Sequence, residues 1–190
     1  MTKQELFIRS NEELLKVIDK ISEDNWNLDM PKGSSRKPTK LNQAVRYHTY
    51  DDAWVPDVLD GKNKEEVGDK YDYLLNNEEI KQNYKKYNEI ANEAVKNFKD
   101  LEKITHLSYG DYPAKDYLQH IISFRSFRAY DIAKLIGIEL KLPEDYIRAL
   151  IDEFTPVLDL YRSMGVFPPE VKVPDDASLQ TKLFAMIGRQ

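Results

Sequence analysis

Charged side chains interrupt two apolar stripes whose spacing is typical of helices facing a core. Both stripes repeat at alternating spacings of four and three. The first consists of Leu41, Val45, His48, Asp52, Val55 and Leu59, and the second of Leu118, Ile121, Arg125, Arg128, Ile132 and Leu135. This spacing keeps side chains on one helix face, so the four ionisable groups are expected to point inward. Burying an unpaired ion is costly, and we therefore expect these groups to contact one another or a ligand.

These residue types support several kinds of chemistry. His48 could be a metal ligand, a general base tuned by Asp52 one turn away, or a core histidine with a satisfied hydrogen bond. Asp52 could bind a metal or pair with an arginine. Arg125 and Arg128 suit a small organic acid because the guanidinium fork matches a carboxylate, although Arg128 could also neutralise Asp52 or extend toward solvent. We predict a ligand pocket of His48, Asp52, Arg125 and Arg128, with His48 and Asp52 as its candidate metal ligands.

Composition limits the choice of partners and location. The 190 residues, 41% of them hydrophobic, suffice for one domain with a sizeable core. The net charge of -5 and the lack of a basic stripe argue against nucleic acid. No cysteine occurs, so thiol chemistry would need an external thiol. The charged N-terminus and the absence of a long apolar run predict a cytoplasmic protein without a membrane segment.

Periodicity and helix-end signals predict an all-α, DinB-like four-helix bundle with an additional helix, a proline-rich strap and a short C-terminal helix. The predicted helices cover 2–21, 40–59, 80–101, 113–137, 143–163 with a break at Thr155-Pro156, and 179–187. A loop at 29–39 and a crossover at 61–76 join the early helices, and the strap follows Gly165. No segment alternates as a strand. We predict one domain, 1–190, with the bundle at 1–163 and the strap and last helix at 164–190. The 80–101 helix shows no polar break in its stripe and is predicted to be purely structural.

Three segments carry a family resemblance: LNQAVRYH at 41–48, SFRSFRAYDIAKLIGIELKLPEDYI at 123–147 and MGVFPPEVKVPDDASLQTKLFAMIGR at 164–189. They resemble the DinB-like bundle proteins, and most of all the mycothiol-dependent maleylpyruvate isomerase N-terminal family. The resemblance implies a divalent metal held by a histidine on the second helix and by an acid or histidine followed four residues later by a histidine. His48 matches the first position, whereas Phe124 and Arg128 occupy the other two. Neither of these side chains can ligate a metal.

Three functions remain open from the sequence. The leading hypothesis is a bundle with an altered metal site whose central pocket binds a small anionic molecule. The second is a metal-dependent transferase or isomerase that uses an external low-molecular-weight thiol, with His48 and Asp52 as ligands. The third is a structural bundle, with a homodimer as a further expectation, in which the polar cluster only fixes helix register.

Overall fold

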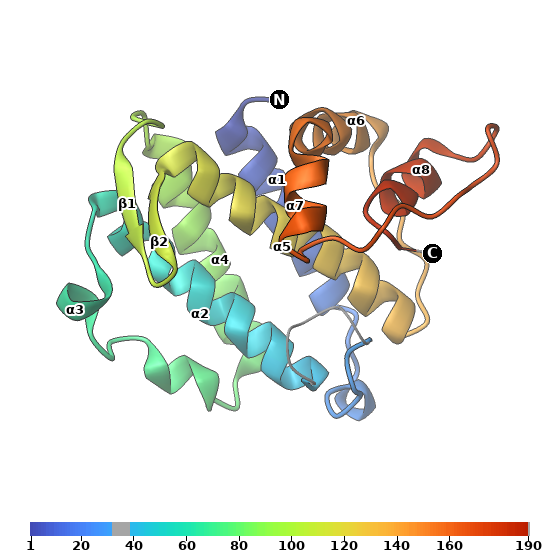
Figure 1. Cartoon of the computed structure of the whole chain (residues 1–190). Helices are drawn as coiled ribbons and strands as arrows, with labels where there is room; N and C mark the ends of the chain where they lie inside the picture. Colours follow the sequence, from blue (N-terminus) through green and yellow to red (C-terminus); the bar gives the residue numbers. More distant parts are fainter. Residues whose placement is uncertain (32–38, 190) are drawn as a thin grey trace. The chain divides into compact units, whose positions relative to one another are not determined.

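The computed structural model describes residues 1–31 and 39–189, and helices dominate it (Figure 1). The chain divides into two compact units, Thr2–Leu140 and Lys141–Gln190. This division falls earlier than the predicted subdivision after residue 163. Most of the predicted loop at 29–39 lies outside the described residues.

Four long helices build the first unit, which confirms the predicted helical class. They are α1 (Lys3–Ile18), α2 (Leu41–Asp60), α4 (Ile80–Asn97) and α5 (Ala114–Leu135). Helix α2 packs along α4, and α1 packs along both α5 and α4. By contrast, α2 and α5 come close to each other at few positions. The polar side chains singled out from the sequence lie between these two helices.

Helices α2 and α4 run in the same direction. Arg46 Nε near the start of α2 donates to Asn77 O just before α4, and Asp52 further along α2 meets Asn88 further along α4. The predicted crossover at 61–76 is thereby confirmed. It contains the short helix α3 (Lys64–Val67) and the 3-10 helix η2 (Asp72–Leu75). Lys70 and Tyr71 within this connection donate hydrogen bonds to Asp57 of α2.

The start of α1 follows the predicted capping signal. Thr2 Oγ1 accepts from the Glu5 backbone N–H at 3.2 Å, and Thr2 N donates to Glu5 Oε2 at 2.7 Å. The helix ends at Ile18, three residues before the predicted end at Ile21. Helix α4 likewise ends at Asn97 and not at the predicted residue 101.

A small hairpin corrects the expectation that no segment is a strand. Strands β1 (Ile104–Leu107) and β2 (Gly110–Pro113) pair antiparallel, with Thr105 opposite Tyr112. Thr105 is the one buried residue of β1, so the segment has no alternating apolar pattern to detect. The hairpin contacts α2 and α5, and in Figure 1 it covers one end of this pair of helices.

The second unit contains α6 (Glu144–Phe154), the 3-10 helix η3 (Thr155–Val157), α7 (Leu158–Ser163) and α8 (Leu179–Met186). The predicted break at Thr155-Pro156 is confirmed. Phe154, Tyr161 and Phe167 pack with ring centroids 5.2 to 6.2 Å apart and form a small aromatic core. Ser178 caps α8 by accepting from Thr181 N. No helix in the described part of the chain is long and apolar enough to cross a membrane.

Candidate functional site

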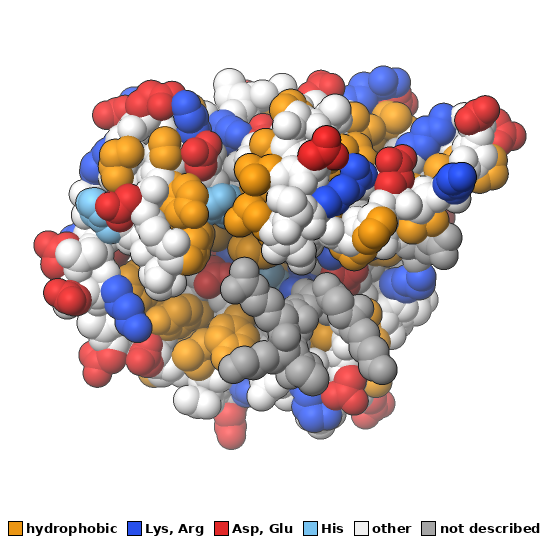
Figure 2. All heavy atoms as spheres, in the orientation of Figure 1, with side chains coloured by type: hydrophobic (Ala, Val, Ile, Leu, Met, Phe, Trp, Pro, Cys, Tyr) orange, Lys and Arg blue, Asp and Glu red, His pale blue; other side chains and the backbone are white. Residues whose placement is uncertain are grey.

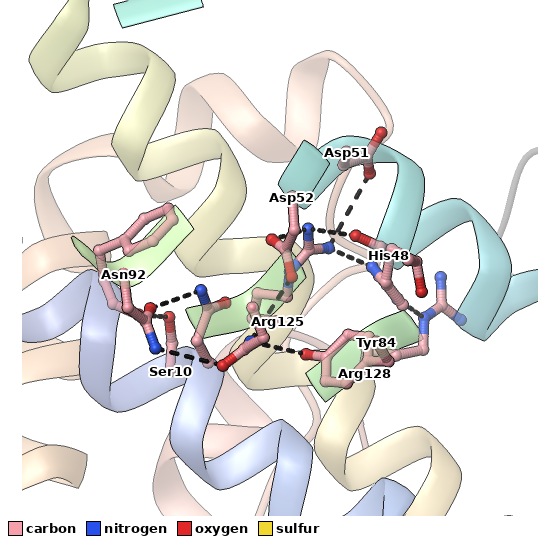
Figure 3. Close-up of polar contacts among 12 residues, drawn as sticks. Ser10, His48, Asp51, Asp52, Tyr84, Asn92, Arg125 and Arg128 are labelled. Atoms are coloured by element: carbon pink, nitrogen blue, oxygen red, sulfur yellow. Dashed lines mark hydrogen bonds and ion pairs between the residues drawn. The ribbon is translucent and has the colours of Figure 1, made fainter. Parts of the chain in front are cut away.

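The structure brings the four predicted pocket residues together between α2 and α5 (Figure 3). Arg125 Nη2 donates to Asp52 Oδ1 at 2.7 Å and to the His48 backbone O at 3.1 Å. Arg125 Nη1 contacts His48 Nδ1, and Arg128 Nε lies 3.2 Å from His48 Nε2. His48 therefore lies between the two guanidinium groups.

Arg125 and Asp52 form the interior of this cluster. Both side chains are fully excluded from solvent, whereas Arg128 keeps 12% of its side chain exposed. Burial raises the pKa of Asp52, and hydrogen bonds and charge from Arg125 oppose the rise. Burial lowers the pKa of Arg125, but the charge of Asp52 outweighs burial and raises it overall. The two groups thus hold each other in the charged state.

A chain of amide side chains extends the cluster across the bundle. Asn88 Nδ2 donates to Tyr84 OH at 3.3 Å and lies 3.5 Å from Asp52 Oδ2. Asn92 Nδ2 donates to Asn88 Oδ1 at 3.2 Å, and Asn11 Nδ2 donates to Asn92 Oδ1 at 2.9 Å. The 80–101 helix, predicted to be structural from a stripe with no polar break, contributes Asn88 and Asn92 to this chain of amides. Asn88 follows Tyr84 by four residues, which places it on the buried face of the same helix.

His48 is neutral in this environment. Burial lowers its pKa well below the usual range, and the positive charges of Arg125 and Arg128 lower it further. A neutral imidazole has one N–H donor and one acceptor nitrogen, whereas a guanidinium group only donates. The neutral ring can therefore accept a hydrogen bond from one guanidinium group at a time.

The contact between His48 and Arg128 is a hydrogen bond. Arg128 Nε donates to His48 Nε2 at 3.2 Å. A guanidinium group has five N–H donors, so Arg128 can donate to an acceptor on a ligand while it keeps this bond.

Asp51 is a member of the site that the sequence analysis missed. Its Oδ2 lies 3.9 Å from Arg125 Nη1, and 42% of its side chain is exposed. Burial of its inner side raises its pKa to about 6, against the opposing charge of Arg125. Within the described residues, the carboxylate of Asp51 accepts no hydrogen bond. It lies off the four-three stripe, so periodicity alone gave no sign of it.

Acidic and aromatic side chains lie around this cluster. Asp131 Oδ2 is 3.9 Å from Arg128 Nη1 on the same helix face. Tyr50, Trp54 and Tyr71 pack with ring centroids about 6 Å apart (5.9 and 6.0 Å), so these aromatic residues mainly pack together. Figure 2 shows hydrophobic side chains gathered over α2, where Tyr47 is 56% exposed.

The residues present do not fit the divalent metal that the family resemblance implies. Both ring nitrogens of His48 face guanidinium groups, and Asp52 is held by Arg125. Phe124 offers no donor atom. A divalent cation here would lie beside two positive charges. Within residues 1–31 and 39–189, no three His, Cys, Asp or Glu side chains gather as a metal-binding group.

Comparison of the chain with family models, with curated proteins and with solved structures gave no match. The DinB-like resemblance therefore rests on the segments at 41–48, 123–147 and 164–189. The side chains that meet between α2 and α5 carry the functional proposal.

Proposed function

We propose that this helical bundle binds a small organic anion between α2 and α5, and that His48 and Arg128 contact it. The observation that carries the proposal is the meeting of two guanidinium groups around a neutral histidine, with Arg128 partly exposed. A carboxylate beside Arg128 would accept charge-assisted hydrogen bonds from its guanidinium group.

The four predicted pocket residues divide into two roles under this proposal. Arg125 and Asp52 are wholly buried and hydrogen-bonded to each other and to His48, so they hold the site. They fix the histidine ring. Arg128 then presents N–H groups to the ligand, and the exposed 12% of its side chain gives access.

The local charge favours a monocarboxylate over a phosphate. Of the two arginines, Arg125 is neutralised by Asp52, and His48 is uncharged. Asp51 and Asp131 lie near the guanidinium groups and add negative charge. A dianion would be repelled more strongly than a monoanion by these carboxylates.

We also propose that the bundle is DinB-like, with Arg128 as an internal cation where the resembled family has a metal-binding imidazole. This places a permanent positive charge at the position of a metal ligand. The thiol-dependent metalloenzyme expected as an alternative is not proposed, because the donor groups for its metal are not present together. The structural alternative makes a different prediction, since it requires no ligand.

Isothermal titration calorimetry with acetate, propionate, butyrate and inorganic phosphate tests the proposal. Arg128→Met keeps an unbranched side chain but removes every donor, and it should weaken carboxylate binding roughly tenfold or more. Arg148→Met is the matched control, because Arg148 is an exposed arginine that pairs with Glu144 on the same helix. Phosphate should bind more weakly than the carboxylates. Equal affinity in Arg128→Met and the unaltered protein, or no carboxylate binding at all, would overturn the proposal.

A further inference from the structure

We infer that the hairpin of β1 and β2 is a lid over the Asp51 end of the polar cluster, and that Tyr109 and His120 form the latch that keeps it closed. The hairpin contacts both α2 and α5, and in Figure 1 it covers one end of this pair of helices. The inference adds regulated access to the proposed anion site and rests on that site for its function. Its test needs no ligand.

The base of the hairpin is firmly attached to the first unit. Ala114 N at the start of α5 donates to Lys103 O at 2.8 Å, and Lys103 Nζ donates to Leu59 O near the end of α2 at 2.7 Å. Thr105, the buried residue of β1, donates from Oγ1 to Tyr112 O at 2.8 Å. These bonds join the base to both long helices, so the base forms a fixed pivot.

The tip of the hairpin is held against α5 by aromatic side chains. Tyr109 OH lies 3.2 Å from His120 Nδ1, and the centroids of the two rings are 5.8 Å apart. Tyr112 packs edge-on against the same imidazole at 5.2 Å and against Tyr109 at 5.6 Å. Ser108, Tyr109 and Gly110 at the turn are exposed. A tip held by one cluster of side chains can separate from α5 while the base stays attached.

The closed tip lies beside Asp51. Burial and then the negative charge of Asp51 raise the pKa values of Tyr109 and Tyr117, so both phenols are near that carboxylate. Tyr117 is 4% exposed, and Asp51 Oδ2 lies 3.9 Å from Arg125 Nη1. Movement of the tip away from α5 would therefore uncover Asp51 and, behind it, the guanidinium group of Arg125. The lid controls access to the polar cluster from this side.

Acid should favour opening of the lid. Burial lowers the pKa of His120 in the closed state, and the charge of Asp116 on the same helix opposes this effect. The phenols of Tyr109 and Tyr112 face the ring from the hairpin, with Asp51 of α2 near Tyr109. Opening returns the imidazole to water and raises its pKa toward about 6.5, so the open state binds the proton more readily. Protonation therefore shifts the equilibrium toward the open state as the pH falls through about 6.5.

Distances between paired spin labels test the lid, because the chain has no cysteine of its own. Ser108→Cys labels the tip, and Lys134→Cys labels an exposed position on α5, 14 residues beyond His120 and about 21 Å along the helix. Double electron–electron resonance at about pH 8 should show mainly one distance. Tyr109→Ala should add a longer distance, because it removes the latch. Tyr47→Ala is the control and should not, since Tyr47 is an exposed tyrosine of α2.

The same labels measure the effect of acid. Between about pH 8 and pH 5.5 the longer distance should grow in the labelled protein. It should also grow in His106→Gln, the control, because His106 is the hairpin's other histidine and pairs with Asp111. His120→Gln should show the longer distance at both pH values. An unchanged distance in Tyr109→Ala would overturn the lid, and so would a His120→Gln variant that stays closed at pH 8 and opens in acid.

The outcomes separate this inference from the proposed function. If the tip moves as expected but carboxylates do not bind, the lid stands and the anion site is overturned. If carboxylates bind in a manner that depends on Arg128 but Tyr109→Ala leaves the distance unchanged, the anion site stands and the lid is overturned. Circular dichroism of each labelled variant confirms that folded proteins are compared.

Discussion

Arg125 donates to Asp52 at 2.7 Å in an ion pair from which solvent is wholly excluded. A buried pair of this kind contributes little compared with apolar packing, but removal of one partner leaves an uncompensated charge. The pair also fixes the position of His48 through the two contacts that Arg125 makes with it. The binding chemistry proposed for His48 and Arg128 therefore depends on a structural unit behind them.

Arg125→Met should lower the free energy of unfolding by about 3–5 kcal/mol, because Asp52 loses its counter-ion in the core. The double variant Arg125→Met/Asp52→Leu should recover at least half of this loss. Urea denaturation measures both effects. If Arg125→Met has the same free energy of unfolding as the unaltered protein, the ion pair does not stabilise the site.

Arg128→Met should have no stability cost of this kind. Arg128 keeps 12% of its side chain exposed, and the ion pair that the variant breaks with Asp131 spans 3.9 Å. The melting temperature should stay unchanged or rise while carboxylate binding falls, as expected at a site kept for function. A large fall in melting temperature would favour the purely structural reading of Arg128.

Arg128→Met should also raise the pKa of His48. In the unaltered protein burial, Arg125 and Arg128 all lower this pKa, and the variant removes one of the three causes. Because the folded-state pKa lies below the unfolded value, the unfolded chain binds the proton first as the pH falls. Stability contributed by the neutral ring is therefore lost below about pH 6.5. NMR titration of the His48 ring protons measures the shift, and an unchanged pKa would contradict the contact.

Asp57, near the end of α2, should make the free energy of unfolding depend on pH in the acid range. Burial opposes ionisation, but hydrogen bonds from Lys62, Lys70 and Tyr71 lower its pKa to about 2. The folded pKa is below the unfolded value, so this contribution is present above about pH 4 and is lost as the pH falls toward 2. It amounts to roughly 2 kcal/mol. Asp57→Asn should remove this part of the pH dependence in urea denaturation, and an unaltered acid profile in the variant would refute the assignment.

Gly188 should tolerate no side chain in the second unit. Its φ is +76°, and an added Cβ would lie 2.6 Å from Pro168 Cβ and 2.8 Å from the Pro169 backbone O. Gly188→Ala should therefore speed limited proteolysis of residues 141–190 much more than Gly165→Ala. Gly165 has a similar φ of +69° but no atom within 4 Å of an added Cβ. Similar proteolysis of the two variants would contradict this close packing.

The sequence predicted the parts of the site that follow helical periodicity. The four-three spacing placed His48 and Asp52 opposite Arg125 and Arg128, and the contacts between them are present. The long connection at 61–76 also predicted that α2 and α4 run in the same direction. The spacing of apolar residues and the length of a connection are both visible in a single sequence.

The remaining parts depend on contacts between distant segments. Asn88 is a single polar residue on an otherwise apolar helix face. Its contact with Asp52 was not predicted, because Asp52 is 36 residues away in the sequence. Asp51 joins the site although it lies beside the stripe and not within it. The hairpin at 104–113 has a single buried residue in β1, and its pairing gives no periodic signal. The charge state of His48 depends on burial and on the two arginines that lie beside it in the fold.

The charge state of His48 is the most direct test of the site. Nitrogen-15 NMR of the imidazole at neutral pH distinguishes the neutral ring from the charged ring. The proposal predicts a neutral ring, because burial and the charges of Arg125 and Arg128 lower its pKa. A charged ring would mean that the two guanidinium groups do not lie beside His48 as described, and the basis for an anion site would be lost.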